Sequence, residues 1–89
     1  MDVTVILAGT LAARTGTHRA RVGVPEGATV SDVVDALADE YGPQVRPGVL
    51  EGEHIRSDTI VVRDAADAGP LTADSHVEPG DTVRFLLAA

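Results

Sequence analysis

The chain has 89 residues, with 44% hydrophobic and 24% charged side chains, and we expect residues 1–89 to form a single globular domain. Its formal net charge of −7 argues against nucleic acid and membranes as partners, because an acidic domain repels phosphate groups. Cysteine is absent, which excludes disulfides, thiolate metal sites and thiol nucleophiles. The start of the chain lacks the basic and long apolar regions of a signal peptide, so a cytoplasmic location is expected.

The first part of the chain predicts a β-hairpin. Residues 3–8 are rich in β-branched side chains, and residues 18–24 alternate polar and apolar side chains up to Pro25. A short connection bracketed by glycines joins the two segments. We therefore expect them to pair as neighbouring strands.

An amphipathic helix is the clearest element of the sequence. Thr29 is a good N-cap, and Asp32 completes a capping box three residues later. Gly42 supplies a stop, and Pro43 prevents continuation. The apolar side chains at helical spacing on one face are Val30, Val33, Val34, Leu37, Ala38 and Tyr41.

The second half of the chain predicts three further strands. Residues 43–58 are irregular, although their apolar side chains can pin a short helical turn to the core. Residues 59–63 read as the third strand, and residues 70–71 open a short edge strand. A Pro-Gly turn then precedes the last strand at residues 82–87.

This order of elements predicts an α+β fold. A hairpin followed by one amphipathic helix needs a sheet face that buries the apolar stripe of the helix. If the last strand returns to lie parallel to the first, the result is a mixed sheet of four to five strands with one main helix packed across one face. That is the β-grasp, or ubiquitin-like, arrangement.

Three stretches of the chain resemble the MoaD/ThiS family of ubiquitin-like sulfur carriers. They are the opening strand, the turn and helix entry at residues 25–37, and residues 77–86, in which Gly80 and Asp81 precede the last strand. In that family a ubiquitin-activating-type enzyme adenylates the C-terminal carboxylate, which becomes a thiocarboxylate. The carrier then delivers sulfur to a biosynthetic enzyme, as in molybdopterin or thiamine biosynthesis. The resemblance implies that these two enzymes are the partners of the chain.

The C-terminal residues depart from that family, which ends in Gly-Gly. By the resemblance, Ala89 is the sulfur-accepting residue, with Leu87 and Ala88 as its tail. Glycine reaches backbone conformations closed to alanine, so two additional methyl groups have to fit the partner's channel. Three explanations of this end stay open: a carrier whose partner accepts alanine, a sequence that stops short of a natural Gly-Gly, and a protein that has left covalent chemistry. Two functions follow from them. One is a sulfur carrier for cofactor, cysteine or natural-product biosynthesis, and the other is a non-catalytic binding or regulatory module that acts through the open sheet face.

Strand alternation predicts which side chains form that open face. If Val3, Val5 and Leu7 face the helix from the first strand, and Val83 and Phe85 from the last, the alternate side chains face away from it. β-grasp proteins commonly bind partners through this face. The predicted partner-binding face comprises Ile6, Arg19, Arg21, Val61, Arg84 and Leu86. The alternative is a half-exposed sheet with a few ordinary surface aliphatic side chains.

No other set of residues forms a recognisable chemical site. His18, His54 and His76 lie far apart without ligand spacing, and the carboxylates of the predicted helix are expected to be a solvated face. The sequence contains no phosphate-binding loop and no nucleophile motif. We therefore expect no metal, no cofactor and no catalytic residue, so that the chain is a co-substrate or accessory subunit rather than an enzyme.

Overall fold

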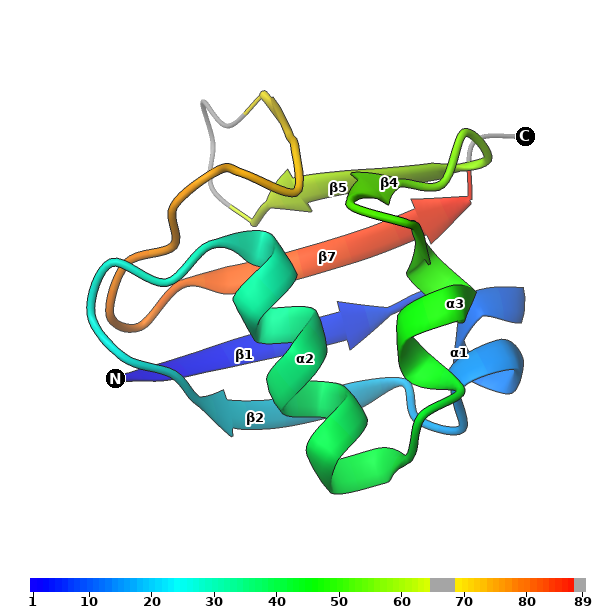
Figure 1. Cartoon of the computed structure of the whole chain (residues 1–89), viewed down its shortest axis with the longest axis horizontal. Helices are drawn as coiled ribbons and strands as arrows, with labels where there is room; N and C mark the ends of the chain where they lie inside the picture. Colours follow the sequence, from blue (N-terminus) through cyan, green and yellow to red (C-terminus); the bar gives the residue numbers. More distant parts are fainter. Residues whose placement is uncertain (65–68, 88–89) are drawn as a thin grey trace.

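The protein is built on a mixed five-stranded sheet (Figure 1). The computed structural model describes residues 1–64 and 69–87. In spatial order the strands are β2 (Arg19–Gly23), β1 (Asp2–Leu7), β7 (Thr82–Leu87), β5 (Thr59–Arg63) and β6 (Pro70–Leu71). The pair β1–β7 is parallel, and the other neighbouring pairs are antiparallel. The predicted hairpin, the parallel return of the last strand and the short edge strand are confirmed.

Helix α2 (Val30–Tyr41) crosses one face of this sheet (Figure 1). The predicted capping box is present, because the Thr29 hydroxyl accepts from the Asp32 N–H at 3.3 Å and the Asp32 carboxylate accepts from the Thr29 N–H at 2.9 Å. These bonds satisfy two of the N–H groups that a helix start leaves unpaired. The buried side of the helix is formed by Val30, Val33, Val34 and Leu37.

A short helix, α1 (Thr10–Thr15), occupies the connection between β1 and β2, where no helix was predicted. Leu11 is fully buried, and the buried Thr15 hydroxyl donates to the Leu11 carbonyl at 2.7 Å. Gly16 ends the helix with a left-handed φ of 86°. Six residues span fewer than two helical turns, which is too short for a periodic pattern in the sequence. The helix is held instead by the buried Leu11 and by the hydroxyl of Thr15.

The segment between α2 and β5 holds helix α3 (Val45–Val49) and a hairpin of two short strands, β3 (Leu50–Glu51) and β4 (His54–Ile55). The helical turn was predicted, and the hairpin was not. Two-residue strands are too short to show the alternation that identifies a strand.

The core lies between the sheet and the three helices. Phe85 of β7, the only phenylalanine, is fully buried. The aliphatic side chains packed with it include Val3, Val5, Leu7, Leu11, Val22, Val30, Leu37, Val45 and Val83. Among the described residues, no helix is long and apolar enough to cross a membrane.

Candidate functional site

The sheet face opposite α2 is the first candidate site. In β1, Val3, Val5 and Leu7 are buried, whereas Thr4 and Ile6 are only partly buried. Strands β2 and β7 alternate in the same way. We define the open face as the side chains that point away from the helix side on the four longer strands: Asp2, Thr4, Ile6, Arg19, Arg21, Ile60, Val62, Thr82, Arg84 and Leu86.

The strand register brings arginine and aliphatic side chains together on the open face. Ile6 lies opposite Arg19 of β2 and opposite Arg84 of β7. On the next strand, Val62 lies opposite Arg84, and Ile60 lies opposite Leu86. Directly opposed residues on neighbouring strands share a face and contact one another. The open face therefore holds a row in which aliphatic and cationic side chains alternate, with an aliphatic pair beside it.

The placement of Val61 on this face was wrong. Val61 is 1% exposed and lies opposite Phe85 in the ladder, so it belongs to the core. Its neighbour Ile60 occupies the open face and is 38% exposed. Three successive apolar residues, Ile60, Val61 and Val62, leave the alternation of this strand undefined in the sequence. The register with β7 decides between the two faces, and Ile60 is the residue that the sequence reasoning missed.

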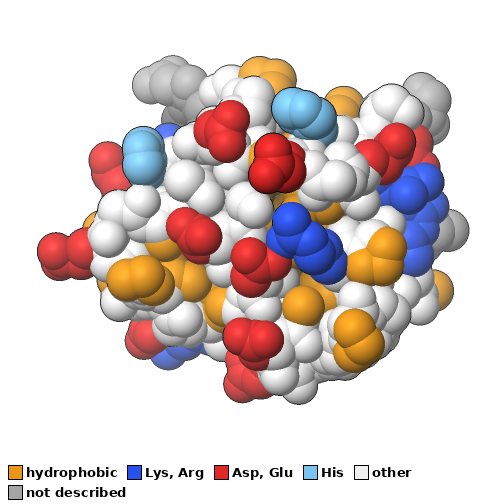
Figure 2. Space-filling view, in the orientation of Figure 1, with side chains coloured by type: hydrophobic (Ala, Val, Ile, Leu, Met, Phe, Trp, Pro, Cys, Tyr) orange, Lys and Arg blue, Asp and Glu red, His pale blue; other side chains and the backbone are white. Residues whose placement is uncertain are grey.

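The two sides of the molecule differ in charge. Arg84 forms an ion pair with Asp64 at 3.3 Å, and Arg19 and Arg21 are exposed and form no ion pair with another described residue. On the helix side, acidic side chains are spread over the surface around a few basic ones (Figure 2). There Arg46 of α3 is paired with Asp35 of α2. The open face thus carries Arg19 and Arg21, unpaired among the described residues, with the carboxylate of Asp2 at the start of β1.

The three histidines lie on separate elements. His18 precedes β2, His54 lies in β4, and His76 follows β6. The His76 Nδ1 is 2.9 Å from the carbonyl oxygen of Gly27, and this contact joins two loops. Among the described residues, no group of three His, Cys, Asp or Glu side chains could hold a metal ion.

The C-terminal strand is the second candidate site. Strand β7 lies between β1 and β5 and remains paired up to its last residue, since Leu87 lies opposite Thr59. Leu87 is partly buried against the core. The predicted sulfur-accepting residue Ala89 and the tail residue Ala88 lie outside the described residues.

A charged cluster at the start of β5 was not predicted. The carboxylate of Asp58 lies 3.5 Å from Arg14 and 3.4 Å from Arg56, and it accepts a hydrogen bond from the Thr59 hydroxyl at 2.9 Å. The Thr59 hydrogen bond lowers the pKa of Asp58, partial burial opposes it, and the two guanidinium groups lower the pKa further. Because Thr59 is also the ladder partner of Leu87, this cluster adjoins the end of the C-terminal strand.

Known proteins resemble this chain in structure, whereas no significant similarity in sequence was found. No family model matches the chain, and no curated protein matches it significantly. Among solved structures, small archaeal modifier protein 1 of Haloferax volcanii has a TM-score of 0.82 and 22% identity, over 100% of this chain and 97% of that one. A putative molybdopterin converting factor subunit 1 of Pyrococcus furiosus has a TM-score of 0.73 and 18% identity, over 100% and 99%.

A chain of the BexX/CysO complex of Amycolatopsis orientalis has a TM-score of 0.74 and 22% identity, over 98% of this chain and 96% of that one. At such identities the likeness describes the fold, and it extends over nearly the full length of each protein. The predicted resemblance to MoaD-type ubiquitin-like proteins is therefore confirmed in structure, and the chain has the β-grasp fold that these proteins share.

Proposed function

We propose that the chain is a ubiquitin-like sulfur carrier, whose C-terminal carboxylate is adenylated and then converted to a thiocarboxylate. The observation that carries the proposal is the end-to-end structural likeness to a molybdopterin converting factor subunit and to a chain of the BexX/CysO complex. The resemblance of residues 25–37 and 77–86 to the same kind of protein supports it independently. The sulfur then serves cofactor, cysteine or natural-product biosynthesis.

The proposed chemistry needs only one reactive group on this chain. The Ala89 carboxylate attacks the α-phosphorus of ATP and releases pyrophosphate, which gives an acyl-adenylate. Hydrosulfide then attacks the acyl carbon, AMP leaves with the electron pair of the broken C–O bond, and the thiocarboxylate remains. The activating enzyme supplies the nucleotide site, and the chain acts as its protein co-substrate. Its biosynthetic partner afterwards takes the sulfur and regenerates the carboxylate.

The end of β7 is held in the sheet, where Leu87 is paired with Thr59. An activating enzyme would bind the residues after Leu87 beside this edge of the sheet, or the pair formed by Thr59 and Leu87 would open when the complex forms.

We propose the open face as the docking surface for these enzymes. Its centre is aliphatic, with Ile6, Ile60 and Leu86, and Arg19 and Arg84 flank Ile6. Interfaces are commonly anchored by apolar and arginine side chains at their centre. A partner surface with aliphatic side chains surrounded by carboxylates would complement it.

A second function is favoured by the composition of the open face. Its aliphatic and arginine side chains can bind a partner without any reaction at the C-terminus. On this view the protein is a β-grasp binding or regulatory module that uses the open face without covalent sulfur chemistry. The two functions share the docking surface and differ in whether the terminal carboxylate reacts.

Pyrophosphate exchange tests the first step of the proposed function. A candidate ubiquitin-activating-type enzyme is incubated with ATP and labelled pyrophosphate, with and without the chain. We expect exchange that requires the chain and disappears when its C-terminal carboxylate is amidated. If the enzyme binds the chain but exchange is absent or insensitive to amidation, the carrier function is excluded and the binding module remains.

A further inference from the structure

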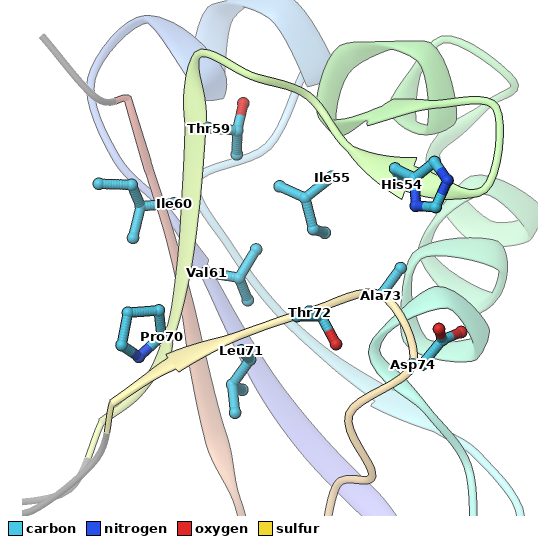
Figure 3. Close-up of a pocket in the computed structure, with 10 residues that line it drawn as sticks. All are labelled: His54, Ile55, Thr59, Ile60, Val61, Pro70, Leu71, Thr72, Ala73 and Asp74. Carbon is cyan, nitrogen blue, oxygen red and sulfur yellow. The ribbon is translucent and has the colours of Figure 1, made fainter.

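A pocket of about 310 Å³ lies between β4, β5 and β6, at the β6 edge of the sheet (Figure 3). Its apolar wall is formed by Ile55, Val61, Leu71 and Ala73. In Figure 3, Ile55 faces Val61 across the space, whereas Ile60 projects from the other side of β5. Ile60 still contributes to the lining, so the pocket adjoins the open face at this residue, and Thr59, the ladder partner of Leu87, lines it as well.

The pocket exists because β6 leaves the sheet early. Pro70 lies opposite Val62 and Leu71 opposite Val61, so a longer β6 would place its next two residues opposite Ile60 and Thr59. Instead the chain turns, and the Ser75 N–H donates to the Thr72 carbonyl at 3.1 Å. Among the described residues, Thr59 and Ile60 therefore have strand partners in β7 alone, although the Thr59 N–H already donates to the Arg56 carbonyl at 2.9 Å.

The turn that follows β6 is fixed to the rest of the fold. The Ala73 carbonyl accepts from the N–H of Ser31 in α2 at 3.0 Å, and Ala73 itself is buried. Leu71 and Ile55 remain only partly buried, and both face the pocket. The pocket is therefore a preformed notch between anchored elements, and its volume is at the small end of the range for ligand pockets, about 300–1,000 Å³.

A polar hollow of about 290 Å³ adjoins this notch and shares His54 and Asp74 with it. Its two other carboxylates belong to Asp32, which is engaged at the helix cap, and to Glu53. Its only arginine, Arg46, is paired with Asp35. Glu53 and Asp74 form no ion pair with another described residue, so a cation beside them would be stabilised.

We propose that this notch binds an extended segment of a partner protein, in which an aliphatic side chain enters the pocket and a basic side chain lies beside Asp74. The segment would lie extended beside β5 where β6 leaves it and would be held by its side chains, because the Thr59 N–H already donates to the Arg56 carbonyl. Alternate residues of an extended segment point to the same side and lie about 7 Å apart. The segment recognised is therefore aliphatic-any-basic.

The choice of a basic and aliphatic segment as the occupant follows from the apolar pocket and from the polar hollow beside it. The apolar wall selects an aliphatic group, and the acidic hollow selects a cation. The pocket lies beside β5 where Thr59 and Ile60 have no partner in β6, so an extended segment fits there. A net charge of −7 on the chain favours a basic segment further. The inference does not depend on the sulfur-carrier function, since neither the C-terminal carboxylate nor an activating enzyme takes part.

The test uses the whole chain, labelled with ¹⁵N, and the peptide acetyl-Thr-Leu-Thr-Lys-Thr-amide. Two matched peptides replace the lysine by glutamate or the leucine by serine, and n-butylamine tests whether a small amphiphilic amine suffices. We expect the first peptide to shift the amide signals of Thr59, Val61, Leu71 and Asp74, and the two matched peptides to bind much more weakly. We expect butylamine to leave the Thr59 amide unshifted.

Two variants with the same change of charge locate the basic side chain. Asp74→Asn should weaken binding by about threefold, the effect of one exposed ion pair, and Asp39→Asn on α2 should leave it unchanged. Ala73→Leu, which fills the pocket, should abolish the shifts. Equal binding of the glutamate peptide, the same shifts with butylamine, or shifts that cluster on Ile6 and Leu86 would each overturn the inference. Asp74 is exposed, so Asp74→Asn remains informative if Ala73→Leu fails to fold.

Discussion

Thr59 and Leu87 lie opposite each other in the ladder between β5 and β7 and form the pair nearest to the C-terminal residues. Thr59 is buried, and its hydroxyl donates to Asp58, which also contacts Arg14 and Arg56. The strand that leads to the proposed reactive carboxylate is thus attached to a charged cluster that joins α1 to β5. Opening the pair formed by Thr59 and Leu87 would therefore also disturb this cluster.

The opposite orientations of Val61 and Ile60 predict different costs of truncation. Val61→Ala removes buried methyl groups beside Phe85 and should lower the free energy of unfolding by about 2 kcal/mol. Ile60→Ala removes a side chain that is 38% exposed and should cost less than about 1 kcal/mol. Denaturant unfolding of the two variants measures both values. A larger cost for Ile60→Ala would mean that the face assignment of β5 is wrong.

Ile60 also distinguishes a docking surface from an ordinary sheet face. Ile60→Ser should weaken binding to the activating enzyme by about tenfold, the loss expected for a central interface side chain. Tyr41→Ser is the matched control, because Tyr41 is 40% exposed and lies at the end of α2. Calorimetric titration gives both affinities. Equal affinities for the two variants would remove the open face from the proposal and leave the fold unaffected.

The lowered pKa of Asp58 predicts that the stability of the fold depends on pH. Its pKa in the folded protein is lowered from 3.8, chiefly by the Thr59 hydroxyl and then, against partial burial, by Arg56 and Arg14. Its contribution to stability is therefore complete above pH 3.8 and is lost as the pH falls through the lowered pKa.

Asp58→Asn should accordingly reduce the Tm at neutral pH and have a progressively smaller effect below pH 3.8. Thermal unfolding of both proteins across this range gives the comparison. Asp39→Asn serves as the control, because Asp39 is exposed and forms no ion pair with another described residue. A deficit for Asp58→Asn that grows as the pH falls would show that the carboxylate does not stabilise the fold in this way.

The sequence was sufficient to predict the helices and strands that have a long or chemically distinct residue pattern. Helix α2 was predicted because its apolar stripe runs through twelve residues and its cap requires the pair formed by Thr29 and Asp32. Strand β1 alternates regularly, so the open position of Ile6 followed from the sequence. The short strand β6 was predicted from Pro70 and Leu71 alone, but the pocket beside it depends on where the following turn leads.

Other features depend on contacts between distant residues, which no local pattern reports. The burial of Val61 follows from its pairing with Phe85, which is 24 positions further along the chain. The cluster at Asp58 exists because α1 brings Arg14 to the start of β5. Helix α1 and the hairpin of β3 and β4 are each too short to produce a periodic signal.

The most direct test of the sulfur-carrier function is the intact mass of the chain after incubation with its activating enzyme, ATP and a sulfur donor. The double variant Ala88→Gly/Ala89→Gly, which restores the Gly-Gly sequence of the resembling family, is measured in parallel. We predict that the unaltered chain gains the mass difference between sulfur and oxygen, and that the variant does so faster because glycine enters a narrow channel more freely. An unchanged mass for the unaltered chain, when the variant is converted by the same enzyme, would contradict the sulfur-carrier function of this chain.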